Sequence, residues 1–348
     1  MRTSVTILAI LFVQYAHSRA EPKSSPEPLP EPLPETWPES WPEAWPVAWP
    51  EPVAEPFFRS DDNCAFGVKV VSLLLFNSRI TGQNMSINDM CTNVDSSKKV
   101  VFLTHGFLSS ADTENFVELA RQLRDKGHTV LGVDWRQGAC TGGFPTYGSA
   151  VTNTVEVGRR VAGFAEKLVN ECHVPLNNII FIGHSLGAHV SGFAAKEIKK
   201  KNLGTVPLII AADPAGPKLG SKECDDRLCK TDANCLKVLH TSWMFGITRP
   251  IGHLDLQFNG GSSQPDCNWP PCSHSAAVVY IIDAVKGNCA FPGVPMTNSP
   301  KYPSNTNTNC ILVNENLLDT SCSIKGEYYT FVNGDSHCTQ NPPQKCQQ

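Results

Sequence analysis

Residues 178–187 read Asn-Ile-Ile-Phe-Ile-Gly-His-Ser-Leu-Gly. The first part, 178–183, is a short apolar run typical of a strand buried on both faces. The second part, 183–187, has the pattern Gly-x-Ser-x-Gly, and a helical pattern follows over 187–200. A nucleophilic serine needs a tight strand-to-helix turn that exposes its hydroxyl, and the two glycines allow the strand and helix to approach. We therefore predict that Ser185 is a nucleophile.

Strand-like and helical patterns alternate on both sides of this motif. Apolar runs predict strands at 99–104, 128–135, 178–183 and 208–212, and helical spacing predicts helices at 115–126, 155–172 and 187–200. This alternation indicates βαβ units and hence an α/β fold, with a mostly parallel central sheet and helices on both faces. Residues 291–348, rich in Pro, Asn, Thr and Cys, are expected to form a disulfide-pinned C-terminal cap.

The composition describes a chain made of unlike segments. Its 348 residues are 41% hydrophobic and carry 29 basic and 33 acidic side chains, which argues against bulk disorder and nucleic-acid binding. Residues 1–56 hold 3 of the basic and 8 of the acidic residues, so residues 57–348 carry 26 basic and 25 acidic side chains. The body of the protein is therefore close to neutral, and its charge indicates no particular partner.

The first twenty residues are predicted to be a secretory signal peptide. Arg2 precedes an apolar run over 5–13, and small residues stand near Ala20. The run is too short to cross a membrane but suits a cleaved signal. We expect an exported, extracellular protein.

Residues 21–56 form a proline-rich tract with 12 of the 27 prolines. Taken in pairs from Glu21, every second residue is Pro, Ala, Ser or Thr. We predict a propeptide that a dipeptidyl peptidase removes two residues at a time, as in the dipeptide-repeat pro-regions of insect venom peptides. The mature domain would then span 57–348. A stiff linker is the alternative.

All 14 cysteines lie between Cys64 and Cys346, an even number in an exported chain, which predicts disulfides rather than metal ligands. The close spacings Cys224–Cys229 and Cys267–Cys272 suggest two small loops, and the wider connectivity stays open. Asn84-Met85-Ser86 is a sequon, so Asn84 is a candidate glycosylation site. An unmodified sequon is the alternative.

Ser185 requires a base and an acid, which follow the serine in folds of this kind. Asp213 ends the next strand-like run, LIIAAD, and is the predicted acid. His274 is the predicted base, on a loop between Cys272 and a helical run. His240, His253 and His337 compete with it, and Asp134 is expected to be structural. For the oxyanion hole we predict the backbone N–H groups of Leu186 and of Phe107 in Thr-His-Gly-Phe.

Together these segments resemble the pancreatic-lipase family. Seven segments occur in that family's order across most of 64–290: THGF, DWRQGAC, GHSLGAH, DPAGP, VLHT, GHLDLQFNGG and CSHSAAVVYI. Within the family, the chain is most similar to the phospholipase A1 enzymes of wasp and other hymenopteran venoms. The resemblance implies an α/β-hydrolase fold and the triad Ser185, Asp213 and His274. It also implies Phe107 and Leu186 as oxyanion donors. Cys64–Cys140 is a further candidate disulfide.

Departures from the family pattern bear on the substrate. Triglyceride lipases of the family have a long disulfide-bounded lid before the catalytic histidine and a C-terminal lipid-binding sandwich domain. Here Cys267 and Cys272 enclose only Asn268-Trp269-Pro270-Pro271, and we expect no sandwich domain. Family members with shortened lids tend to be phospholipases A1, which is an analogy rather than a derivation.

The resemblance thus implies an exported serine esterase that cleaves the sn-1 ester of phospholipids, with a role in venom. A triglyceride or galactolipid lipase is the alternative, and a non-catalytic lipid-binding or storage protein a more distant one. We expect a monomer that acts on a membrane surface or micelle, with no cofactor and no catalytic metal. Trp243-Met244-Phe245 is expected either to enter the membrane or to pack under the lid.

Overall fold

The computed structural model describes residues 64–140, 143–334 and 336–347. The predicted signal peptide at 1–20 and the predicted propeptide at 21–56 lie outside these residues.

Seven parallel strands form the centre of the sheet: β3 (Val100–Thr104), β4 (Thr129–Asp134), β5 (Ile179–His184), β6 (Val206–Ala212), β7 (Ala233–His240), β8 (Leu254–Phe258) and β11 (Gly326–Thr330). Nearly every residue from β3 to β8 is buried. These strands carry apolar residues on both faces, as parallel strands covered by helices require.

Antiparallel strands extend this centre at both edges. At one edge β1 (Ser72–Phe76) pairs with β4 and with the exposed strand β2 (Thr81–Asn84). At the other edge β9 (Phe291–Pro295) pairs with β11 and with β10 (Ile311–Val313). The sheet order is β10-β9-β11-β8-β7-β6-β5-β3-β4-β1-β2.

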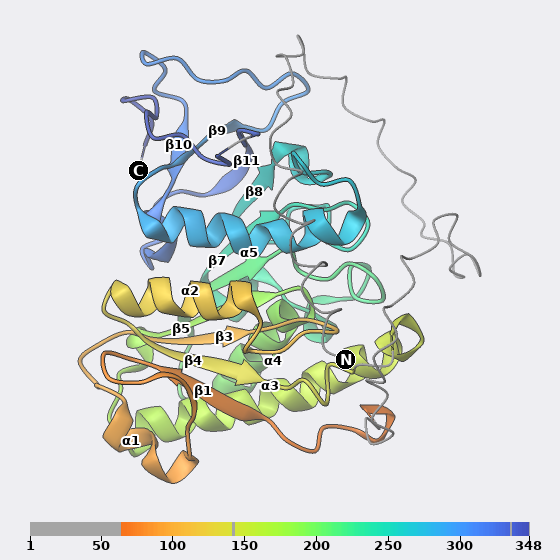
Figure 1. Ribbon diagram of the computed structural model, residues 1–348, viewed down its shortest axis with the longest axis vertical. Coiled ribbons are helices and arrows are strands. Elements are labelled where there is room, and N and C mark those ends of the chain that lie inside the picture. Colours follow the sequence, from red (N-terminus) through yellow and green to blue (C-terminus); the bar gives the residue numbers. More distant parts are fainter. Residues whose placement is uncertain (1–63, 141–142, 335, 348) are drawn as a thin grey trace, which may run out of the picture. The chain divides into compact units, whose positions relative to one another are not determined.

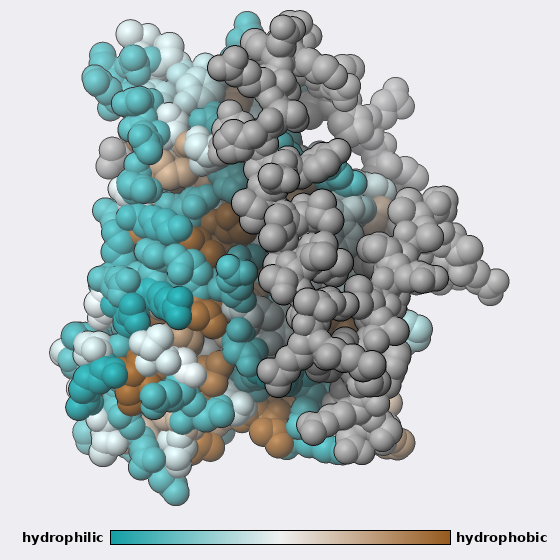
Figure 2. Space-filling model, viewed as in Figure 1, coloured by the Kyte–Doolittle hydropathy of each residue, from teal (hydrophilic) through white to brown (hydrophobic). Residues whose placement is uncertain are grey.

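Helices cover both faces of the sheet (Figure 1). Helices α2 (Glu114–Asp125) and α5 (Pro270–Lys286) lie on one face, and α3 (Tyr147–Asn170) and α4 (Leu186–Lys200) pack together on the other. The short helix α1 (Met90–Asn93) follows β2. In Figure 2 the side that carries α2 and α5 is mainly hydrophilic, with smaller hydrophobic patches between, as expected of amphipathic helices.

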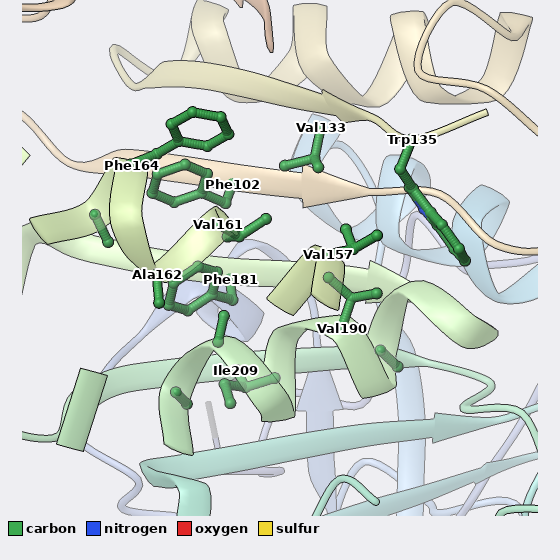
Figure 3. Packing of buried hydrophobic residues seen from close by; sticks show 14 of the residues in the cluster. Phe102, Val133, Trp135, Val157, Val161, Ala162, Phe164, Phe181, Val190 and Ile209 are labelled. Atoms are coloured by element: carbon green, nitrogen blue, oxygen red, sulfur yellow. The ribbon is translucent and has the colours of Figure 1, made fainter. Parts of the chain in front are cut away.

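The sheet separates two hydrophobic cores because successive strand residues point to opposite faces. In β5, Ile179 and Phe181 belong to the core under α3 and α4, whereas Ile180 and Ile182 belong to the core under α2 and α5. Figure 3 shows the first of these cores, in which the rings of Phe102 and Phe181 stack 5.2 Å apart. This packing holds the ends of the central strands in fixed positions.

The predicted α/β fold with helices on both faces is confirmed. One expectation is wrong: residues 291–348 do not form only a cap, because β9, β10 and β11 continue the central sheet. Strand β11 adds parallel to β8, and β9 returns antiparallel beside it. Such pairings join residues far apart in sequence, and local composition does not reveal them.

Seven disulfides join the fourteen cysteines of the described chain. The structure pairs the three candidates of the sequence analysis, Cys64–Cys140, Cys224–Cys229 and Cys267–Cys272. The other four pairs are Cys91–Cys172, Cys235–Cys322, Cys289–Cys338 and Cys310–Cys346. Three of these hold residues 291–348: one ties them to β7, one to the segment between α5 and β9, and one joins two of their own cysteines.

Two further observations concern the glycosylation candidate and the possibility of a membrane-spanning helix. Asn84, the candidate glycosylation site, is exposed at the end of the edge strand β2. Within the described ranges, no helix is both long enough and apolar enough to cross a bilayer.

Candidate active site

Ser185 lies in a sharp turn between β5 and α4. Its backbone has φ 56° and ψ −122°, a region that non-glycine residues rarely adopt. A side chain at Gly187 would collide with the backbone of Thr104 and His105, and one at Gly183 would collide with Gly187. The two glycines are therefore required by the close approach of strand and helix, as the motif predicts.

Asp213 and His274 meet beside this turn. Asp213 directly follows β6, is completely buried, and has its backbone in the left-handed region at φ 44°. Its Oδ2 lies 2.6 Å from Nδ1 of His274. Because a buried carboxylate is an acceptor, Nδ1 of His274 donates this bond, and Nε2 of the neutral ring carries the lone pair.

The structure corrects the predicted setting of His274. We expected a loop, but His274 belongs to α5, which starts at Pro270. Proline fits the first turn of a helix, where its missing N–H is not needed, so Pro270 and Pro271 begin a helix rather than prevent one. His274 therefore sits on a rigid element.

His184 joins the serine turn to His274. Its Nε2 donates to the His274 carbonyl oxygen over 3.0 Å, and the two rings lie 4.6 Å apart. Burial lowers the pKa of His184 to about 3, and His274 adds to this effect. Among the described contacts, no hydrogen bond joins the Ser185 hydroxyl to His274. Catalytic hydrogen bonds in free enzymes are often long and tighten once substrate is bound.

The competing histidines have other partners. His240 bonds to Asp255 and to the Ile247 carbonyl, and His253 accepts the N–H of Leu236. His337 bonds to Asp283, which raises the pKa of His337. Of the four histidines considered, the structure brings only His274 to Asp213.

The two predicted oxyanion donors come from separate elements. Leu186 is the first residue of α4, where a backbone N–H has no partner within the helix. Phe107 follows β3 in the loop that packs against the serine turn. Indeed, a Cβ placed at Gly106 would lie 2.7 Å from Cβ of Ser185. The loop after β3 is therefore directly against the predicted nucleophile.

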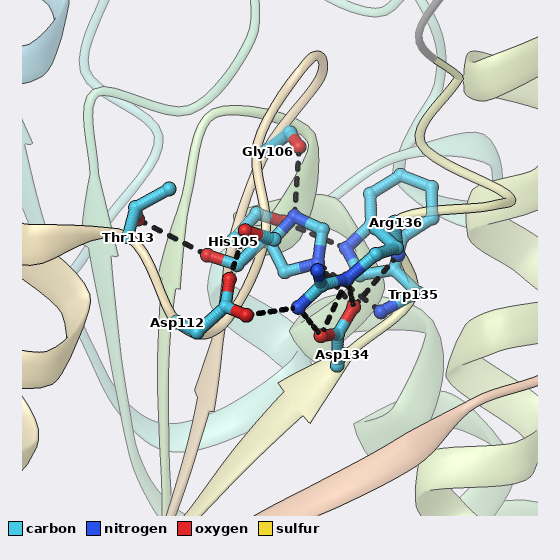
Figure 4. A network of polar contacts seen from close by, with 8 residues as sticks. His105, Gly106, Asp112, Thr113, Asp134, Trp135 and Arg136 are labelled. Carbon is cyan, nitrogen blue, oxygen red and sulfur yellow. Dashed lines mark hydrogen bonds and ion pairs between the residues drawn. The ribbon is translucent and has the colours of Figure 1, made fainter. Parts of the chain in front are cut away.

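A polar network that is buried at His105 and Trp135 holds this loop (Figure 4). Nε1 of Trp135 donates to the His105 carbonyl over 2.8 Å, and the Trp135 backbone N–H donates to Nε2 of His105 over 3.1 Å. The two rings also stack 5.5 Å apart. These reciprocal contacts fix the chain two residues before Phe107.

Asp134 completes the network from the end of β4. Burial alone would raise the pKa of Asp134, but contacts with His105 and Arg136 hold it well below its ordinary value. Arg136 also forms an ion pair with Asp112, 2.7 Å away. Asp134 thus stays charged and ties the end of β4 to the loop after β3.

A row of aromatic side chains, the aromatic wall, connects the loop after β3 to His274. The ring of Phe107 lies 5.1 Å from that of Tyr147 and 6.1 Å from that of Phe144. Phe144 stacks on Phe245 at 6.2 Å, and Phe245 lies 5.6 Å from the ring of His274. Phe144 was not predictable as a site residue, because the residues around it form no recognisable motif.

The predicted lid is a short disulfide loop. Cys267 and Cys272 are bonded, and the last three of the six residues already belong to α5. The structure places Trp269 at the N-cap of that helix, with an exposed side chain. In the neighbouring 243–245 segment, Trp243 is exposed while Met244 and Phe245 are half-buried.

Comparison with known proteins decides the family. The family described as Lipase matches residues 75–328, which is more than half of the chain. The chain belongs to the lipase family. Its relatives include "Phospholipase A1" of Solenopsis invicta, 41% identical over 295 residues, covering 77% of this chain and 85% of that protein. "Phospholipase A1" of Vespula squamosa is 41% identical over 283 residues, covering 77% and 94%.

The predicted resemblance to the pancreatic-lipase family is thereby confirmed. Among solved structures, the Pyrococcus furiosus esterase Pf2001 aligns with 42% of this lipase and 62% of its own chain, at 19% identity and a TM-score of 0.26. In the described part of this lipase, no group of three His, Cys, Asp or Glu side chains could hold a metal ion.

Proposed function

We propose that this lipase-family protein is an exported phospholipase A1 that hydrolyses the sn-1 acyl ester of glycerophospholipids. The observation that carries the proposal is its identity of about 40% with relatives named Phospholipase A1 over about four fifths of the chain. The site supports it with the bonded pair Asp213 and His274 beside a serine in a strained turn.

The proposed reaction runs through an acyl-enzyme. Nε2 of His274 takes the proton from the Ser185 hydroxyl as Oγ attacks the ester carbonyl, and Asp213 stabilises the imidazolium that forms. His274 then gives the proton to the leaving alcohol oxygen of the lysophospholipid. In the second half, His274 activates a water molecule that releases the fatty acid and frees Ser185.

The surroundings of Ser185 suit this sequence of steps. The N–H groups of Phe107 and Leu186 would donate to the oxyanion of the tetrahedral intermediate, where loss of one donor commonly costs about 10²- to 10³-fold in rate. The aromatic wall of Phe107, Phe144 and Phe245 offers an apolar surface for an acyl chain next to His274.

The short loop between Cys267 and Cys272 favours a phospholipid over a triglyceride. A six-residue loop whose second half is already helical is too small to fold over and seal a deep apolar site. The site therefore stays accessible to a polar head group.

A direct comparison of substrates tests the proposed substrate class. The secreted, disulfide-intact protein is given phosphatidylcholine micelles, a galactolipid and triolein in parallel, and the released fatty acid is measured. We expect phosphatidylcholine to be the best substrate. Faster release from triolein or the galactolipid would keep the triad but overturn the phospholipase assignment.

We further propose that exposed apolar side chains beside the site bind the phospholipid surface. Trp243 and Leu108 are 38% and 46% exposed and belong to loops that also carry Phe245 and Phe107. Aromatic side chains favour the membrane–water boundary.

Trp243→Ala and Leu108→Ala should each weaken binding to phosphatidylcholine vesicles in a flotation assay. Tyr302→Ala, between β9 and β10, is the control, and unchanged binding by both site variants would exclude this surface.

Export is supported by the seven disulfides, which form in oxidising compartments. The resemblance to hymenopteran venom enzymes extends the proposal to a membrane-disrupting role in venom. The start of the mature chain at Phe57 stays a prediction, and N-terminal sequencing of the secreted protein tests it: a start within 21–50 would exclude stepwise trimming of the whole tract.

A further inference from the structure

The carboxylate of Asp213 has a second side-chain donor besides His274. The hydroxyl of Ser242, in the loop between β7 and β8, donates to Oδ2 of Asp213, the same oxygen that accepts Nδ1–H of His274. The other oxygen, Oδ1, accepts the backbone N–H groups of Thr241 and Ser242 over 2.9 and 3.2 Å. Four hydrogen bonds thus hold a carboxylate that is completely buried.

The geometry around Ser242 fixes the direction of its hydroxyl. The backbone N–H of Gly246 donates to Oγ of Ser242 over 3.1 Å, so this oxygen already serves as an acceptor there. Its proton is therefore left to point at Asp213. The same Oγ lies 3.4 Å from Nδ1 of His274, so Ser242 borders both members of the pair.

The loop that carries Ser242 is itself anchored. It begins after His240, whose ring bonds to Asp255 and to the carbonyl oxygen of Ile247. Farther along, the Phe245 carbonyl accepts the N–H of Gly216 over 2.7 Å, and Ile247 N–H donates to the Pro214 carbonyl over 2.8 Å. The loop is thus tied to the segment that follows Asp213, and Ser242 is 2% exposed.

We infer that Ser242 is a positioning residue for the reaction. Its hydroxyl fixes the plane of the Asp213 carboxylate, so that Oδ2 faces Nδ1 of His274 and Nε2 is directed toward Ser185. The inference rests on the proposed Ser185–His274–Asp213 triad. No sequence pattern pointed to Ser242, because a serine after a strand is common and only the fold brings it to Asp213.

This role is tested by measuring kcat and KM on a short-chain phosphatidylcholine. Because this substrate stays monomeric, membrane binding does not contribute to the measured values. The variants are Ser242→Ala and the equal-sized pair Ser242→Thr and Ser242→Val, which differ in the hydroxyl alone. Ser191→Ala is the matched control, since Ser191 is also buried and its hydroxyl, among the residues that the structure describes, bonds to the Gly187 carbonyl rather than to Asp213 or His274. Titration with an alkyl phosphonate counts the competent sites in each preparation.

We expect Ser242→Ala to lower kcat per titrated site by about 10- to 100-fold, as for a lost hydrogen bond to a charged group, with KM changed less than about 3-fold. The kcat per titrated site of Ser242→Thr should exceed that of Ser242→Val by about 10-fold. The kcat of Ser191→Ala should equal that of the wild type. Ser242→Ala and Ser242→Val with wild-type kcat per site would overturn the inference, leaving Ser242 a purely structural residue. An inert wild-type enzyme would instead contradict the proposed function itself.

Discussion

At the scale of single residues, the site uses backbone conformations that ordinary side chains avoid. Ser185 and Asp213 both have positive φ, at 56° and 44°, and each directly follows a buried strand. Such conformations cost about 1–3 kcal/mol each, so neighbouring contacts must maintain them. The backbone N–H of Ser185 bonds to the Ala212 carbonyl, and that of Asp213 to the Leu239 carbonyl. Adjacent strands thus fix both predicted catalytic residues before substrate arrives.

Replacement of Ser185 tests the predicted nucleophile. Ser185→Ala should reduce kcat by about 10⁶-fold, the scale of triad loss in other serine hydrolases. It should also abolish labelling by a serine-directed phosphonate, which mass spectrometry of the labelled peptide checks. Substantial hydrolysis by a correctly folded Ser185→Ala protein would remove Ser185 from the mechanism.

The candidate site was predictable where the chain carries local signals. The Gly-x-Ser-x-Gly turn identifies Ser185, and an acidic residue at the end of the next strand identifies Asp213 as a candidate. Ser242 and Phe144 were not predictable, because each gains its contact from a residue distant in sequence. The helical position of His274 was missed because the apolar helical pattern is evident only from Ala276 onward, whereas α5 begins at Pro270.

At the scale of elements, the loop after β3 is held by a clamp of His105 and Trp135. Both side chains are completely buried, stack on each other and exchange two hydrogen bonds. Because Phe107 lies two residues beyond His105, this clamp sets the position of a predicted oxyanion donor. We therefore expect that a change which loosens the clamp lowers both the stability of the loop and the rate of the proposed reaction.

Trp135→Phe tests the clamp by removing the indole N–H. The buried His105 carbonyl would lose its donor, which costs about 1–3 kcal/mol of unfolding free energy, and the smaller ring adds a cavity cost. We expect a lower denaturant midpoint and a kcat reduced by about 10-fold. Unchanged kcat in the folded variant would show that the clamp stabilises the loop without positioning Phe107.

At the scale of the whole molecule, the sheet explains what the sequence could and could not predict. The helix predicted at 115–126 corresponds to α2, Glu114–Asp125, and the strand predicted at 99–104 to β3, Val100–Thr104. Their apolar periodicity is a local property. In contrast, β9, β10 and β11 are only three to five residues long. They join the sheet through successive pairings, of β11 with β8, of β9 with β11 and of β10 with β9. The same holds for disulfides between distant cysteines.

Acid should destabilise the whole molecule through two buried histidines. Burial lowers the pKa of His184 to about 3 and that of His189 to about 4, from about 6.5 in the unfolded chain. The unfolded state therefore binds more protons between these values, so stability falls as pH falls below about 6.5. Each histidine contributes up to about 1.4 kcal/mol per pH unit in that window.

Denaturant unfolding of the disulfide-intact protein at pH 7 and pH 5 measures this effect. We expect the unfolding free energy to be lower at pH 5 by up to about 4 kcal/mol. His189→Gln should shrink the difference by about half. His337 acts in the opposite direction, because its bond to Asp283 raises its pKa, but it is partly exposed and its effect is small. Equal stability at the two pH values would contradict the prediction.

The position of the cleaved bond tests the proposed function most directly. The mature protein is given a phosphatidylcholine with different acyl chains at sn-1 and sn-2, and mass spectrometry identifies the released acid, with Ser185→Ala as the control. We predict release of the sn-1 acid by the wild type and of neither acid by the variant. Release of the sn-2 acid, or of no acid, would contradict the assignment as a phospholipase A1.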